Sequence, residues 1–199
     1  MHGQPYAVGL TIGFQGKGIP YGGFGHIRED GGANHGFKLL KGQPRRLDEI
    51  PELKQDAAMR ELVRSLNDAQ TGLVSIGCDS GANSDEHGHR RSGYIEFAVN
   101  SAEKVTDASV YFPLFFHFSR LLHNQKFQER VQFHWSIEPA HFFHPNADGF
   151  TATIYINTIS YPEMGAAQAS WDRSVAVLEY FLRNVPPVNG HPLFDGDEA

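Results

Sequence analysis

Apolar and polar side chains alternate with a period of two along several segments of this chain, and this pattern constrains the fold more than any other feature. In residues 131–138 the apolar set is Val131, Phe133, Trp135 and Ile137, and the residues between them are polar or ionisable. Successive side chains of a β-strand point to opposite faces of its sheet. The segment is therefore predicted as a strand with one buried face and one hydrophilic face.

Further strands are predicted on the same grounds. Residues 6–14 place five apolar side chains on one face and only small ones on the other, among them Ala7, Gly9 and Gly13. We expect another backbone or a ligand to pack closely against this small face. The other predicted strands, alternating or short and extended, are 24–28, 35–40, 73–79, 93–100 and 151–158.

Three segments instead carry apolar residues three and four positions apart, which predicts helices. The first begins at Asp48, with Pro51 in its first turn, and ends before Gly72. The second covers about 110–123 and the third about 167–183. Because the second is apolar nearly all round, it is predicted either as the central core helix or as a contact with the second subunit of a homodimer.

The elements follow one another in the order βββα, ββα, ββα. This order predicts an α+β fold, with a mostly antiparallel sheet and helices packed on one face. No stretch has the composition of a linker, so residues 1–185 are expected to form a single domain, followed by a loose acidic tail at 186–199. The segment 80–92 is predicted as a long polar loop between two strands.

Composition excludes several classes of function. The chain has 199 residues, 40% of them hydrophobic, and a net charge of −6. No apolar run approaches the roughly 18 residues of a membrane span. The N-terminus lacks a signal sequence and the single cysteine, Cys78, excludes an internal disulfide, so a soluble cytoplasmic protein is expected. The basic residues are few and scattered, which disfavours double-stranded nucleic acid as a partner.

The polar face of the central strands is the first candidate for a functional surface. Tyrosines among hydrogen-bonding groups supply contact area at a small entropic cost. Lysine and arginine are absent from this face, which suits another protein or a small neutral or cationic ligand; the alternative is an ordinary solvated sheet face. The predicted binding residues are Tyr94, Glu96, Gln132, Ser136, Tyr155 and Asn157, with Ser75 and Thr153 beside them.

Acid–base catalysis is the second candidate activity on this face. His134 and Glu138 are the predicted catalytic residues, because an imidazole beside a carboxylate can transfer protons near neutral pH. They are four residues apart on one strand, which separates them by about 13 Å, so they cannot contact each other directly. A carboxylate in contact with His134 therefore has to come from a neighbouring strand. The position of Cys78 in its predicted strand directs the side chain to the apolar face, which predicts a buried, unreactive thiol.

The chain holds eleven histidines, and two histidine-rich segments are candidate metal sites. His141 and His144 are three residues apart and could share an ion within a turn. Asp79, His87 and His89 are further candidate ligands around the 80–92 segment. This mixture of imidazole and carboxylate groups suits zinc, manganese or iron better than calcium. The alternative is that these histidines are simply solvated.

Two functions remain open from the sequence. The first is a soluble binding or interaction protein, an accessory or immunity-type factor that uses the polar sheet face and the 80–92 segment. The second is a metal-dependent enzyme, with hydrolysis as the expected reaction at a His/Asp site. No motif specific to one reaction is present to separate them.

Overall fold

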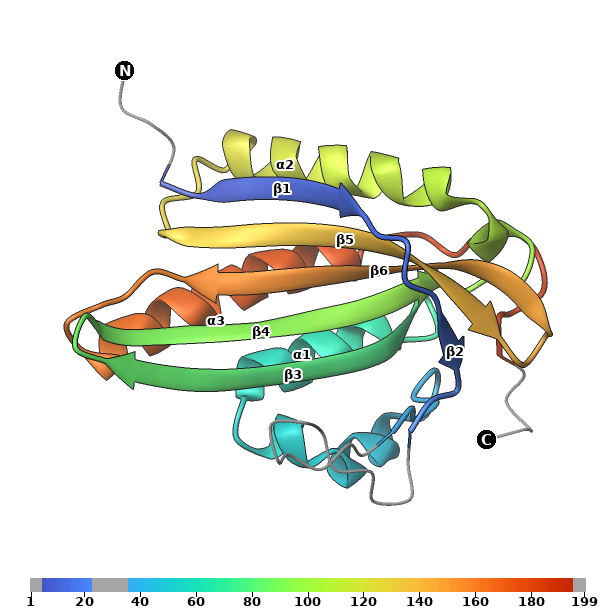
Figure 1. The fold of residues 1–199 in the computed structure, drawn as a ribbon, viewed down its shortest axis with the longest axis horizontal. Helices are drawn as coiled ribbons and strands as arrows, with labels where there is room; N and C mark the ends of the chain where they lie inside the picture. Colours follow the sequence, from blue (N-terminus) through green and yellow to red (C-terminus); the bar gives the residue numbers. More distant parts are fainter. Residues whose placement is uncertain (1–4, 23–35, 195–199) are drawn as a thin grey trace.

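The computed structural model describes residues 5–22 and 36–194, and these residues form a six-stranded sheet with three α-helices packed behind it (Figure 1). The strands are arranged in the order β1-β5-β6-β4-β3, and β2 also pairs with β5. The strands are β1 Ala7–Ile12, β2 Lys17–Ile19, β3 Leu73–Asp85, β4 Gly88–Val99, β5 Val131–Phe142 and β6 Ala147–Thr158. The α-helices are α1 Ala57–Leu66, α2 Phe112–Asn124 and α3 Met164–Leu182.

The predicted α+β class is confirmed, but the sheet is mixed. The pairs β3–β4, β4–β6 and β5–β6 are antiparallel, as expected. Strands β1 and β2 both run parallel to β5, with Leu10 opposite Trp135 and Gly18 opposite His141. The sequence predicted β1 as the first of three successive strands, but its partner in the sheet is β5, more than a hundred residues away.

The segment 80–92 is a β-hairpin, and its prediction as a loop was wrong. Strands β3 and β4 pair from Leu73 opposite Val99 out to Asp85 opposite Gly88. The hairpin turns through residues 86 and 87, where the His87 amide donates to the Asp85 side chain. Both faces of the outer hairpin are polar, so no apolar alternation marked these residues as strands.

The N-terminal third differs most from the prediction. The expected strand 24–28 lies outside the described residues, and the described part of the strand expected at 35–40 is not a strand. Helix α1 begins at Ala57 rather than Asp48, after two 3-10 helices, η1 Pro44–Glu49 and η2 Pro51–Lys54. Each 3-10 helix starts at a proline, which lacks the amide needed inside an α-helix.

The main core lies between the helices and the sheet. It contains the apolar strand residues predicted for this face, including Phe133, Trp135 and Ile137. The Phe118 ring of α2 packs 5.0 Å from the Phe133 ring and 6.0 Å from the Trp135 ring, measured between centroids. The alternation in β5 thus identified its buried face correctly, and the three helices lie on this same face of the sheet (Figure 1).

A second, smaller core covers one end of the opposite sheet face. Ile19 of β2 and Leu39 pack there with Phe142 of β5. Leu193 also belongs to this core, and its amide donates to the Asn100 side chain. Leu193 thus attaches the end of the described C-terminal segment to the domain.

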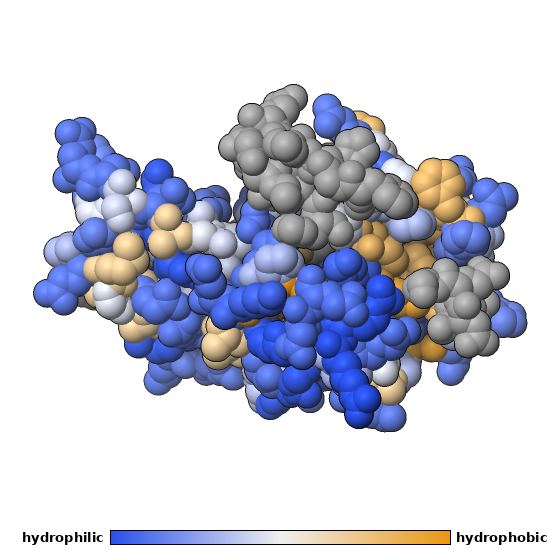
Figure 2. Space-filling model, turned by 90° about the horizontal axis from the view of Figure 1, so that it is seen from below, coloured by the Kyte–Doolittle hydropathy of each residue, from blue (hydrophilic) through white to orange (hydrophobic). Residues whose placement is uncertain are grey.

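The outer surface is largely hydrophilic on the side that carries β3 and the 3-10 helices (Figure 2). Hydrophobic residues on that side gather toward one end of the molecule (Figure 2). Within the described part of the chain, no helix combines the length and the apolar character needed to cross a bilayer.

Candidate functional site

The sheet face away from the helices carries a row of polar and aromatic residues, which we call the tyrosine row. It comprises Asp79, Tyr94, Tyr155 and His134, which are successive partners across β3, β4, β6 and β5. The ring centroids of Tyr94 and Tyr155 lie 5.9 Å apart, and those of Tyr155 and His134 lie 6.4 Å apart. Cross-strand pairing of this kind brings together side chains from four strands.

Tyr155 is the most prominent aromatic side chain of the tyrosine row, with 40% of its surface exposed. Gln132 and Asn157, which face each other across β5 and β6, are also exposed and lie beside it. Burial raises the pKa of Tyr155, with smaller contributions from the charges of Glu138 and Glu96. The phenol therefore keeps its proton and can both donate and accept a hydrogen bond.

His134 ends the tyrosine row and lies against β1. Its Nε2 is 2.8 Å from the Thr11 hydroxyl oxygen. A Cβ added at Gly9 would lie 3.1 Å from His134 Nδ1, and one at Gly13 would lie 2.9 Å from Glu138 Cγ. The small face of β1 is thus filled by side chains of the adjacent strand, rather than by the backbone or ligand that we expected.

The predicted catalytic residues His134 and Glu138 have different partners. His134 contacts Thr11, whereas Glu138 accepts a hydrogen bond of 2.9 Å from the Ser136 hydroxyl. Both side chains are half-buried on the same face of β5. The structure therefore places them on one surface but in separate hydrogen-bonded pairs.

Three of the face residues chosen from the sequence, Glu96, Ser136 and Thr153, are buried. Lys17 of β2 forms an ion pair with Glu96 Oε2. The Lys17 ammonium also lies 5.5 Å from the centre of the Tyr21 ring, and the Tyr21 hydroxyl donates to the Ile76 carbonyl. Residues from β2 and just after it thus close over this part of the face.

Burial around the Lys17–Glu96 ion pair affects two neighbouring polar groups. Burial, reinforced by the charge of Glu96, raises the pKa of Tyr21 well above its ordinary value. The second carboxylate oxygen of Glu96, Oε1, has no hydrogen-bond partner among the described residues. Lys17 therefore supplies the main compensation for a carboxylate that is otherwise removed from water.

Ser75 does not belong to the polar face. The pairing of β3 with β4 shifts register between Ser75 and Gly77, which turns Ser75 toward the end of α1. There its hydroxyl accepts a hydrogen bond of 2.7 Å from the Asn67 side chain. A one-residue bulge reverses side-chain parity, and nothing in the local sequence pattern marks it.

A shallow hollow of about 450 Å³ adjoins the tyrosine row at the β3–β4 hairpin. Its wall includes Asp79, Asn83, Ser92, Tyr94 and Tyr155. Hydroxyl, amide and carboxylate groups dominate this wall, which suits a polar guest better than an apolar one.

The candidate metal ligands lie far apart: the four histidines are at the two ends of the sheet and Asp79 belongs to the tyrosine row. His141 on β5 pairs with Asp148 on β6 at 2.8 Å, while His144 lies in the turn that joins these strands. His89 Nδ1 lies 2.7 Å from the Ser84 hydroxyl, and His87 lies in the hairpin turn. Nowhere in residues 5–22 and 36–194 do three His, Cys, Asp or Glu side chains gather in an arrangement that could hold a metal ion.

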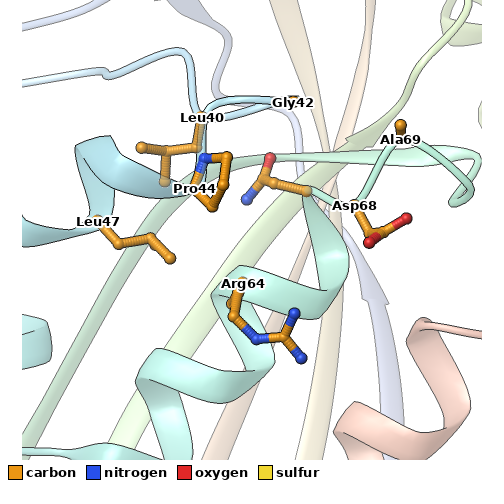
Figure 3. A pocket seen from close by; sticks show the side chains of 8 residues that line it. Leu40, Gly42, Pro44, Leu47, Arg64, Asp68 and Ala69 are labelled. Carbon is orange, nitrogen blue, oxygen red and sulfur yellow. The ribbon is translucent and has the colours of Figure 1, made fainter.

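A separate hollow of about 230 Å³ lies between η1 and α1 (Figure 3). Leu40 and Leu47 form its apolar side, and Arg64 and Asp68 lie at its polar side. Arg64 is held by hydrogen bonds to Glu61, one of which is 2.8 Å long. This hollow could not be predicted from the sequence, because it forms between a 3-10 helix and an α-helix that were predicted as one element.

A buried polar network around Asp56 was not among the sites predicted from the sequence. Its Oδ2 accepts hydrogen bonds from Arg91, Trp171 and Ser80 at 2.5, 2.8 and 2.8 Å, and its Oδ1 caps α1 at Met59. The network joins α1, α3, β3 and β4 on the helix side of the sheet. Arg91 and the buried Ile95 are four residues apart on β4, so their side chains point to the same face of the sheet. An arginine on a buried face indicates that an acidic group is buried beside it.

No known protein family, curated protein or solved structure matches this chain. Of the groups described above, the tyrosine row with Gln132 and Asn157 combines exposure, aromatic area and hydrogen-bonding capacity.

Proposed function

We propose that this chain is a binding protein that holds a segment of another protein against the tyrosine row. The observation that carries the proposal is Tyr155, a large aromatic side chain that is 40% exposed in the middle of a surface built from four paired strands. Tyrosine is enriched among residues that dominate binding energy, because it offers contact area with few rotatable bonds.

The surroundings of Tyr155 support a polar partner. Gln132 and Asn157 supply amide donors and acceptors next to the ring, and His134 is held by Thr11 in a fixed position. Side chains fixed in advance lose little entropy when a partner binds. The same strands hold the central side chains in place, so that this surface is preorganised.

The charge of the sheet face indicates which side chains a partner segment should carry. Glu138 lies on the same face of β5 as His134, and Lys17, which reaches this face from β2, forms an ion pair with Glu96. An acidic or neutral surface favours a partner segment with neutral or basic side chains. The hairpin β3–β4 extends the surface through the hollow beside Tyr94.

The test compares the set of proteins that co-purify with the tagged chain and with two variants. Tyr155→Ala combined with Gln132→Ala removes the aromatic and one polar contact. Tyr180→Ala is the matched control, since Tyr180 is 45% exposed and lies on α3, behind the sheet. Truncation of a dominant interface residue costs about 2 kcal/mol or more, which corresponds to roughly 30-fold in affinity.

We expect a partner that co-purifies with the wild type and the Tyr180→Ala variant but is lost with the double variant. Titration of the purified partner then measures the change in Kd directly. A partner that binds the double variant as tightly as the wild type contradicts the proposal, as does loss of binding in the Tyr180→Ala variant alone.

A further inference from the structure

Two cations of this chain are held in the same way, each between a carboxylate and the face of an aromatic ring. The Arg91 guanidinium pairs with Asp56 at 2.5 Å and lies 5.3 Å from the centre of the Trp171 ring. The Lys17 ammonium, which forms an ion pair with a carboxylate of β4, lies 5.5 Å from the centre of the Tyr21 ring. The ring face and the carboxylate both stabilise the positive charge.

The hollow beside the tyrosine row presents the same two kinds of group. Asp79 and Tyr94 are paired across β3 and β4, and the Tyr155 ring lies 5.9 Å from the Tyr94 ring, measured between centroids. All three residues line the hollow of about 450 Å³. Among the described residues of its wall, Asp79 is the one acidic side chain and there is no lysine or arginine.

The surroundings of the hollow also favour a positively charged guest. The charge of Glu138 contributes, after burial, to the raised pKa of Tyr155, which indicates that the phenol lies in a negative potential. Asn83 and Asn157 add neutral oxygen acceptors to the wall. Aromatic rings, a carboxylate and neutral acceptors together suit a cation that carries several N–H donors.

We infer that this hollow takes an arginine side chain of the partner segment, an inference that rests on the proposed function. Adjacent strands lie about 4.8 Å apart, so Asp79 is about 10 Å from Tyr155 along the row, a span that suits a long side chain. The apolar stem crosses the Tyr155 ring, and the guanidinium stacks on Tyr94 and pairs with Asp79. Arginine suits the hollow better than lysine, because a guanidinium is planar, carries five donors and is more weakly hydrated.

Titration of the full chain with two capped tripeptides, followed by NMR, tests the inference. One probe is glycine–arginine–glycine, and the other has citrulline in place of arginine, which keeps the shape of the side chain but is neutral. Asp79→Asn removes the charge from the hollow. Asp85→Asn is the matched control, because Asp85 lies on the same strand and face about 20 Å away and does not line the hollow. The amide spectra also check that each variant is folded.

We expect the arginine probe to shift the ring resonances of Tyr94 and Tyr155. Its dissociation constant is expected to rise by at least about tenfold in Asp79→Asn and to stay unchanged in Asp85→Asn, because the carboxylate in the hollow supplies the charge-assisted contact. The citrulline probe is expected to bind the wild type at least about tenfold more weakly than the arginine probe. Equal binding of the two probes, or an arginine probe that does not bind or that binds Asp79→Asn as tightly as the wild type, overturns the inference.

Failure of this inference can be distinguished from failure of the proposed function. A partner that is lost with the Tyr155→Ala and Gln132→Ala double variant, but that Asp79→Asn binds with full affinity, supports the proposed function and overturns the arginine site. Binding of the arginine probe that depends on Asp79, without any co-purifying partner, supports the arginine site and counts against the proposed function.

Discussion

The imidazole of His134 lies so close to the backbone of Gly9 that a Cβ at Gly9 would be 3.1 Å from Nδ1. This contact fixes the ring from one side, while the Thr11 hydroxyl fixes Nε2. Both partners belong to β1, a strand that joins the sheet through parallel pairing with β5. The orientation of His134 in the tyrosine row therefore depends on small residues at the sheet edge.

Gly9→Val is expected to displace the His134 ring and to destabilise the protein by about 1–3 kcal/mol, the usual cost of overpacking. Gly16→Ala is the control, because a Cβ there would meet Pro139 at an ordinary 3.8 Å. Urea unfolding measures the free energies, and the imidazole resonances report the ring position. Equal stability of the two variants, with unchanged His134 resonances, would show that the ring is not held by Gly9.

Asp56→Asn is expected to cost about 3–5 kcal/mol of unfolding free energy, because it leaves the buried Arg91 guanidinium without its counter-charge. The amide can still cap α1, so the loss reflects the charge. Asp48→Asn is the matched control: Asp48 pairs with Arg60 but its side chain is 78% exposed, and we expect a change below about 1 kcal/mol. Guanidinium unfolding compares the two variants, and similar losses would contradict a special role for the Asp56 network.

Lys17→Met is expected to destabilise the protein by about 3 kcal/mol, because it leaves Glu96 buried without a counter-charge. Combining it with Glu96→Gln should recover much of this loss, since a neutral amide is easier to bury. A double-mutant cycle in urea measures the coupling between the two side chains. Additive effects would mean that the pair contributes nothing beyond its separate residues.

The strands with one apolar face could be predicted from the sequence, and the reason is visible in β5. Trp135 and Ile137 lie on the face that the helices cover, so burial and alternation coincide. The outer hairpin could not be predicted in this way, because Asn83 and Ser92 are polar and neither face there is buried. Alternation of apolar and polar residues reveals a strand only when its two faces differ in polarity. A strand that is polar on both faces cannot be recognised in this way.

The proposed binding surface could be predicted only in part. Tyr155, Gln132 and Asn157 are accessible, as alternation in β5 and β6 indicated. Glu96 has the same parity but is buried, because β2 approaches from a distant part of the sequence and places Lys17 over it. Side-chain parity predicts which face a residue occupies, whereas the coverage of that face depends on long-range contacts.

Cys78 leads to a prediction about reactivity. Burial raises the pKa of its thiol to about 12, with smaller contributions from nearby carboxylates, the first of them Glu52. The thiolate is the reactive form, so alkylation of the native protein at pH 8 should be at least about a hundredfold slower than in denaturant. The chain has a single cysteine, so mass spectrometry of the iodoacetamide-treated protein reads this site alone. Comparable rates in the native and denatured states would contradict the raised pKa of this half-buried thiol.

The same raised pKa of Cys78 predicts how stability depends on pH. In the unfolded chain the thiol ionises near pH 8.5, whereas in the folded chain it stays protonated up to about pH 12. Between these values the unfolded state binds fewer protons, so the contribution of Cys78 to stability is complete below about pH 8.5 and declines as pH rises. Cys78→Ala removes this contribution, at the cost of a small cavity. We therefore expect unfolding free energies measured from pH 7 to 10 to fall less steeply in Cys78→Ala than in the wild type, and parallel curves would contradict the assignment.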